Sequence, residues 1–149
     1  MSVLASSPHI VQQLEQFYTE LNMAQVERLS YIYADDIEFI DPLHHLHGLQ
    51  DLRSYFEHLL QNTTHCHFEF YSRLIAEGEF SLTWQMQFAH PKLGNGRTLS
   101  LDGISHLKFN DKIYYHRDYY DVSAMLHDHI PVIGWLSKKL KNGLAQWTF

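Results

Sequence analysis

A histidine and a carboxylate at alternating positions near residue 118 could carry out acid/base chemistry. Side chains on a strand alternate between its two faces, so His116, Asp118 and Tyr120 would share one face. The carboxylate could then orient the imidazole or act as a base itself. A register shifted by one residue would turn Arg117 and Asp121 inward instead. A buried hydrogen-bonded network that only specifies the core is the other interpretation.

Asp41 is a second candidate for proton transfer. It alternates with Ile37 and Phe39 in a short predicted strand, and Pro42 follows it. An apolar surrounding disfavours an ionised carboxylate and makes it a better base near neutral pH. The alternative is that the Asp41 side chain caps the following turn, a common role for aspartate.

Histidine pairs and a single cysteine raise the question of metal and thiol chemistry. Three pairs have the His-x-His spacing that places two imidazoles on one face of a strand, as a zinc site can require: His45 and His47, His65 and His67, His127 and His129. The first pair is expected in a loop and the last near a helix end, and no third ligand is evident. We therefore predict no metal site. Cys66 is expected to be a buried, unreactive thiol.

The segments that must position these residues change from helical to strand periodicity along the chain. Apolar residues recur at helical spacing in the first part, and strict alternation follows in the second. The predicted helices cover residues 8–21, 23–34 and 49–60. The predicted strands cover residues 37–41, 66–76, 80–88, 97–109 and 113–122, with a histidine-rich loop at 43–48. Helices followed by a run of strands indicate an α+β fold with a curved antiparallel sheet.

Composition and charge limit the kind of protein. The 149 residues, 45% of them hydrophobic and 14% aromatic, fit a single globular domain, 1–149, with an amphipathic helical extension over 123–149. A formal net charge of −6 with 11 basic residues argues against a nucleic-acid partner. No apolar run reaches the length of a membrane span and no signal peptide is evident, so we expect a cytoplasmic protein without membrane insertion.

Four motifs point to a known superfamily. They are residues 18–21 (Tyr-Thr-Glu-Leu), residues 33–42 (Tyr-Ala-Asp-Asp-Ile-Glu-Phe-Ile-Asp-Pro), Gly48, and residues 101–109. With the order of elements over 8–122, they resemble the nuclear transport factor 2-like superfamily, in its ketosteroid isomerase-like and SnoaL-like polyketide cyclase branch. The resemblance implies a cone-shaped curved antiparallel sheet closed by three N-terminal helices around an apolar pocket, and a homodimer through the sheet face.

The resemblance also implies roles for individual residues. Asp41 matches the aspartate that shuttles protons in ketosteroid isomerase-like proteins. Tyr18 matches the tyrosine of their oxyanion hole if one residue is missing between the first two helices, and Phe17 otherwise. Ser105 stands where these isomerases carry a second acid, which argues against a steroid isomerase. If Arg117 faces inward, the epoxide hydrolases of the superfamily become the closer parallel.

The aromatic residues suggest what the pocket would hold. Residues expected to line it are Phe39, Trp84, Met86, Phe88, Ser105 and Tyr120. Filling of the core is the alternative interpretation. We expect a protein that binds a small apolar molecule and acts as a cofactor-free isomerase, cyclase or dehydratase. A non-enzymatic ligand-sensing or protein-interaction module of the same fold is the alternative, because one fold hosts many functions.

Overall fold

The computed structural model describes residues 8–92, 94–127 and 142. Its helices are α1 (His9–Thr19), α2 (Met23–Val26), the 3-10 turn η1 (Leu29–Tyr31), α3 (Leu49–Asn62), the turn η2 (Gly94–Gly96) and α4 (Val122–His127). Its strands are β1 (Tyr33–Ile40), β2 (His45–His47), β3 (His65–Ala76), β4 (Glu79–Ala89), β5 (Thr98–Phe109) and β6 (Ile113–Tyr120). The predicted α+β class is confirmed.

The sheet is mixed, because one of its pairings is parallel. The strand order is β2-β1-β6-β5-β4-β3, and β1 runs parallel to β6 while every other neighbour is antiparallel. The predicted antiparallel arrangement is confirmed for β3 to β6, and the structure adds one parallel pair, β1 with β6. Strands β1 and β6 are far apart in the sequence, and a long connection allows the parallel direction that a short hairpin forbids.

The predicted second helix is much shorter than expected. It was predicted to run over 23–34, but α2 ends at Val26 and β1 already begins at Tyr33. The backbone N–H of Ile113 donates to the carbonyl of Ile32, and Tyr33 is in register with Ile113. Sheet pairing at this point therefore overrides the local helical pattern.

The histidine-rich segment expected to be a loop contains strand β2. The backbone N–H of Asp41 donates to the carbonyl of His44, which closes a tight turn after β1. His47 then pairs with Glu38 and His45 with Ile40. Three residues are too few to show alternation in the sequence, so this strand could not be recognised from its pattern.

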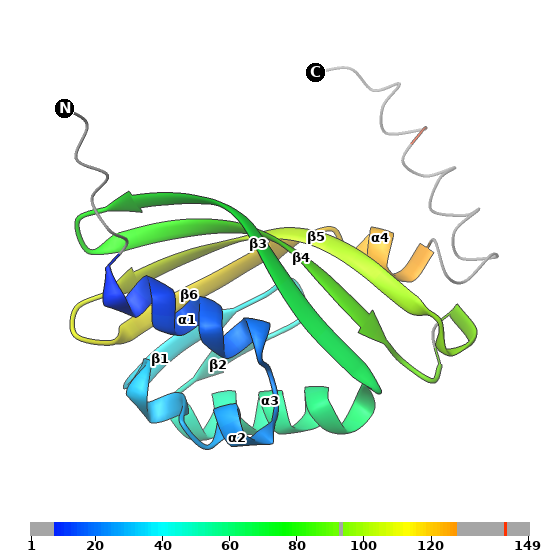
Figure 1. The fold of residues 1–149 in the computed structure, drawn as a ribbon, viewed down its shortest axis with the longest axis horizontal. Helices are drawn as coiled ribbons and strands as arrows, with labels where there is room; N and C mark the ends of the chain where they lie inside the picture. Colours follow the sequence, from blue (N-terminus) through cyan, green and yellow to red (C-terminus); the bar gives the residue numbers. More distant parts are fainter. Residues whose placement is uncertain (1–7, 93, 128–141, 143–149) are drawn as a thin grey trace.

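Helices α1 and α3 cover one face of a curved sheet. Figure 1 shows α1 lying against the sheet and α3 below it, with the long strands β3, β4 and β5 arching over. Helix α1 packs on β3 and α3 packs on β1. Gly48, at φ +87°, turns the chain from β2 into α3 in a backbone conformation that favours glycine. The core of buried aromatic and aliphatic side chains fills the space between these layers.

The end of the chain departs from the prediction at residue 122. The last strand was predicted to reach 122, but β6 ends at Tyr120 and Val122 begins α4. Residues 123–127 of the predicted 123–149 extension belong to α4. Residues 128–141 and 143–149 lie outside the described residues. Within the described segments, no helix is both long and apolar enough to cross a membrane.

Candidate functional site

A partly open cavity of about 700 Å³ lies between α3 and the concave face of the sheet. Its walls are mainly apolar and include five residues predicted to line a pocket: Phe39, Trp84, Met86, Phe88 and Tyr120. Exposed lining residues from the β1–β2 turn and from α3, such as Leu43 and Asn62, mark its mouth. The volume falls in the range of small-molecule sites, about 300–1,000 Å³.

Asp118 brings a carboxylate to the inner end of this cavity. It is carried by β6, and its side chain is 14% exposed. His116 Nε2 lies 2.8 Å from Asp118 Oδ1, and the Ser105 hydroxyl donates to the same oxygen. Within the described residues, Asp118 Oδ2 has no hydrogen-bond partner. The geometry therefore leaves one carboxylate oxygen for a molecule in the cavity while the other is held.

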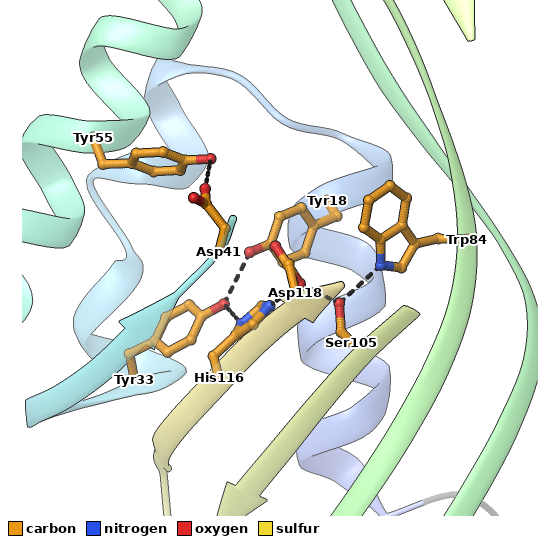
Figure 2. Close-up of polar contacts among 8 residues, drawn as sticks. All are labelled: Tyr18, Tyr33, Asp41, Tyr55, Trp84, Ser105, His116 and Asp118. Carbon is orange, nitrogen blue, oxygen red and sulfur yellow. Dashed lines mark hydrogen bonds and ion pairs between the residues drawn. The ribbon is translucent and has the colours of Figure 1, made fainter. Parts of the chain in front are cut away.

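Ser105, which donates a hydrogen bond to Asp118, is itself fixed by the indole of Trp84. Trp84 Nε1 donates to Ser105 Oγ at 2.8 Å. The two residues lie on neighbouring strands β4 and β5, where Trp84 is directly opposite Gly103. Figure 2 shows the contacts running from Trp84 through Ser105 to Asp118. Ser105 was predicted to line the cavity, but it lies behind Asp118 and is not part of the cavity wall.

A chain of buried tyrosines continues the contacts beyond His116. Tyr33 Oη lies 2.8 Å from His116 Nδ1, and Tyr18 Oη lies 3.1 Å from Tyr33 Oη. Burial is the main cause that raises the pKa of both phenols well above their ordinary value. Both hydroxyls therefore stay protonated at neutral pH. Tyr18 also lines the cavity, so the two ends of this chain, Tyr18 and Asp118, reach the same space.

The direction of these hydrogen bonds depends on the charge of His116. With Asp118 ionised and His116 neutral, Nε2–H donates to Asp118, and Nδ1 accepts from Tyr33, which accepts from Tyr18. The oxygen of Tyr18 then faces the cavity as an acceptor. With His116 doubly protonated, both tyrosines reverse, and Tyr18 can donate into the cavity.

The predicted face of the last strand is confirmed. His116 is 1% exposed and Asp118 lines the cavity, while Arg117 and Asp121 are exposed. The alternative register, with Arg117 and Asp121 inward, is therefore absent. Arg117 instead lies over the ring of Tyr119 on the outer face.

Asp41 is buried but does not line the cavity. Its Oδ1 accepts from the backbone N–H groups of Leu43 and His44, both at 2.7 Å, and His44 Nδ1 lies 3.0 Å away. The hydroxyl of Tyr55 donates to Asp41 Oδ2 at 3.3 Å. This is the turn cap that the sequence allowed as an alternative, and it ties the β1–β2 turn to α3. Figure 2 shows Tyr55 beside Asp41.

Sequence reasoning missed Tyr33 and Tyr55 as members of the site. Tyr33 was assigned to the end of a helix, so its place on the inward face of β1 was lost. Tyr55 lies three residues after Leu52 and beside Phe56, both buried, so helical spacing could have placed it inward. Burial, and next the charge of Asp41, raise the pKa of Tyr55.

Nucleophilic chemistry by the single cysteine, Cys66, is disfavoured. Burial raises the pKa of Cys66 to about 12, so the thiolate is scarce at neutral pH. Among the described residues, one group of three side chains could hold a metal ion, and it lies outside the cavity: Glu38, His45 and His47. His129, from the third His-x-His pair, lies outside the described residues.

Comparison with known proteins identifies the family. Residues 14–116 match the SnoaL-like domain family. A protein from Shewanella putrefaciens, named as a candidate SnoaL-like polyketide cyclase, is similar with 18% identity and a TM-score of 0.68, over 79% of this chain and 93% of that one. A hypothetical protein with a ketosteroid isomerase-like fold from Catenulispora acidiphila, solved in complex with trimethylamine, has 15% identity and a TM-score of 0.67, over 78% of this chain and 88% of that one.

A third solved structure gives the same result. A nuclear transport factor 2-like protein of unknown function from Exiguobacterium has 14% identity and a TM-score of 0.64, over 75% of this chain and 98% of that one. None of the curated proteins matches the chain. At these identities the structures establish the fold alone, while the family match covers most of the chain. The chain therefore belongs to the SnoaL-like domain family, with the nuclear transport factor 2-like and ketosteroid isomerase-like fold.

Proposed function

We propose that the protein binds a small, largely apolar molecule in the cavity and catalyses a cofactor-free proton transfer with Asp118 as the acid/base. The reaction class is isomerisation, cyclisation or dehydration. The observation that carries the proposal is the Asp118 carboxylate in the wall of a mainly apolar cavity of about 700 Å³, held at one oxygen and open at the other. A similar protein of this fold was solved with a small molecule, trimethylamine.

The arrangement suits Asp118 for moving a proton within one bound molecule. Oδ2 would remove a proton from an acidic C–H or O–H of the ligand, while His116 and Ser105 keep Oδ1 fixed. The same oxygen would return the proton to another carbon, or to a leaving hydroxyl. A molecule that fills this mainly apolar cavity would displace water from it, and the electrostatic interactions of the carboxylate with the bound molecule would then be stronger.

Tyr18 would orient a polar group of the ligand. It lines the cavity, and its hydrogen bond to Tyr33 fixes its hydroxyl. With His116 neutral, Tyr18 accepts from a ligand hydroxyl, and with His116 charged it donates to a ligand oxygen. We leave Asp41 out of the chemistry, because its carboxylate is taken up by the turn and by Tyr55.

The role of Asp118 as a base can be tested with a small apolar molecule that carries an acidic C–H group. The probe 5-nitrobenzisoxazole loses a C–H proton to a base, its N–O bond breaks, and the electron pair ends on the oxygen of a coloured cyanophenolate. Asp118→Asn should lower kcat/KM for this probe by about 100-fold or more, the usual contribution of a general base. Asp102→Asn is the matched control, because Asp102 is exposed on the face of β5 that points away from Ser105 and the cavity. It should change kcat/KM by less than about twofold.

Turnover of the probe and binding of the probe distinguish an enzyme from a protein that only binds a ligand. Equal turnover by the Asp118→Asn variant would contradict the role of this carboxylate. Saturable binding of the probe without turnover would leave ligand sensing, the non-enzymatic alternative, as the function of the cavity.

We also propose a homodimer through the outer face of the sheet. Ile104 and Tyr119 are paired neighbours on β5 and β6, and both side chains are exposed on this face. Exposed apolar neighbours of this kind are common at contacts between chains. Light scattering after size-exclusion chromatography should give twice the mass of the chain, and Tyr119→Glu should shift the protein to monomer.

A further inference from the structure

The outer face of the β1–β2 edge carries two histidines and a glutamate that converge on one point. We propose that Glu38, His45 and His47 form a binding site for a divalent late transition metal of the Zn²⁺ class. The site lies on the face away from the cavity and is independent of the proposed catalysis, since none of its members lines the cavity.

Strand pairing brings the three side chains together. His45 and His47 are two residues apart on β2, so they lie on the same face. Glu38 on β1 is directly opposite His47 and diagonal to His45, which is opposite Ile40. Residues in these two relations are within reach of each other's side chains. The backbone therefore fixes the convergence of the three, even though the side chains are exposed.

The distances are close to those of a metal site. Glu38 Oε1 lies 3.9 Å from His45 Nε2, and Glu38 Oε2 lies 4.0 Å from His47 Nδ1. The three ligand atoms are all within 4.8 Å of one another. Ligands held about 2.0–2.1 Å from zinc in tetrahedral geometry are ~3.3 Å apart. Small rotations of exposed side chains close that difference, and these side chains are 37–66% exposed.

The donor set suits zinc and its neighbours in the first transition row. Two imidazole nitrogens and a carboxylate oxygen form a set found at zinc sites with a position left for water. Imidazole favours Zn²⁺, Cu²⁺ and Ni²⁺ over Mg²⁺ and Ca²⁺. Two basic side chains of this sheet face lie over aromatic rings, Arg117 over Tyr119 and Lys108 over Tyr115. Within the described residues, the ion-pair partners of Glu38 are the two histidines.

Calorimetric titration of the untagged full chain with ZnCl₂ tests the site. We expect saturable binding that His47→Gln and Glu38→Gln each weaken at least about tenfold, the loss that even an outer-shell partner can cause. The matched control is His65→Gln, because His65 and His67 have the same spacing on β3 with Glu69 nearby, yet do not form such a group. This variant should retain the wild-type affinity.

Cobalt gives an independent readout of the ligands. Co²⁺ bound by two imidazoles and a carboxylate should show visible absorption bands that Zn²⁺ abolishes by displacement. These bands should disappear in the His45→Gln variant while its circular dichroism spectrum is unchanged. Unaltered zinc affinity in both the His47→Gln and Glu38→Gln variants would overturn the proposal. So would loss of zinc binding in the His65→Gln variant, since it would place the metal on β3.

Discussion

Replacing Gly103 with alanine tests how the inner wall of the cavity is built. Gly103 faces the indole of Trp84 across the β4–β5 pair. A Cβ atom at residue 103 would lie less than 3.0 Å from three atoms of that ring, where ordinary contacts are 3.4–4 Å. The ring must therefore move, and the 2.8 Å hydrogen bond from Trp84 Nε1 to Ser105 moves with it.

The magnitude follows from three contributions to the free energy of unfolding. Overpacking a core position costs about 1–3 kcal/mol. Loss of the Trp84–Ser105 hydrogen bond costs about 1 kcal/mol. Alanine is favoured over glycine in a strand by about 0.5–1 kcal/mol, which acts in the opposite direction. The net expectation for Gly103→Ala is a loss of about 2 kcal/mol, or a urea midpoint lowered by ~1 M at a typical slope.

The same substitution in a Trp84→Phe protein tests whether the Trp84 indole causes the loss of stability. Phenylalanine at residue 84 lacks the outer part of the indole ring that approaches Gly103. In the Trp84→Phe background, Gly103→Ala should cost nothing or increase stability by up to ~1 kcal/mol. Urea unfolding followed by circular dichroism measures all four proteins of the cycle. The same loss in both backgrounds, or a loss below about 0.5 kcal/mol in the wild type, would refute the contact.

Three further predictions concern buried hydroxyl and thiol groups. Tyr33→Phe should lower the free energy of unfolding by about 2–4 kcal/mol, because it removes the hydrogen-bond partner of two buried groups, Tyr18 Oη and His116 Nδ1. Urea unfolding measures this loss. A loss below about 0.5 kcal/mol would contradict the buried hydrogen bonds of Tyr33. Since burial raises the pKa of Tyr18, Tyr33 and Tyr55, the folded state keeps protons that the unfolded state releases above about pH 10. Stability should therefore be lost as pH rises beyond 10, by up to ~1.4 kcal/mol per tyrosine and pH unit. The part of the tyrosinate absorbance that comes from these three buried tyrosines should appear with unfolding and not before it. Burial raises the pKa of the partly buried Cys66 thiol to about 12, which makes the thiolate scarce at pH 8, while the higher pKa makes the remaining thiolate more nucleophilic. Its reaction with a disulfide reagent at pH 8 should therefore be about 30-fold slower in the folded than in the urea-unfolded protein, and equal rates would contradict the effect of burial.

Alternation in the sequence placed His116 and Asp118 on one face of the last strand, and the resemblance to the superfamily indicated that this face points inward. The structure has both side chains on the inward face. The apolar positions of α3 followed helical spacing in the same way, with Leu52 and Phe56 buried. Which side chains share a face depends only on local geometry, and a single sequence carries that information.

Contacts between distant strands could not be predicted in this way. The Tyr33–His116 hydrogen bond needs the parallel β1–β6 pairing, and nothing in either segment specifies its partner. The fit of Trp84 over Gly103 depends on the register of β4 against β5, which a shift of one residue would destroy. The cavity itself depends on how tightly the layers close, a property of packing and not of pattern.

The parallel pairing of β1 with β6 has a consequence for how the protein folds. Tyr33 and Ile113 meet across 80 positions of chain, whereas Ala89 and Thr98 of the β4–β5 hairpin are 9 apart. Closing the longer loop costs about 2 kcal/mol more in chain entropy. We therefore expect β3 to β6 to assemble first and β1 to join late, after the folding transition state. Variants at Tyr33 should then speed unfolding and leave the folding rate almost unchanged, so the two halves of the site come together only as the chain completes its fold.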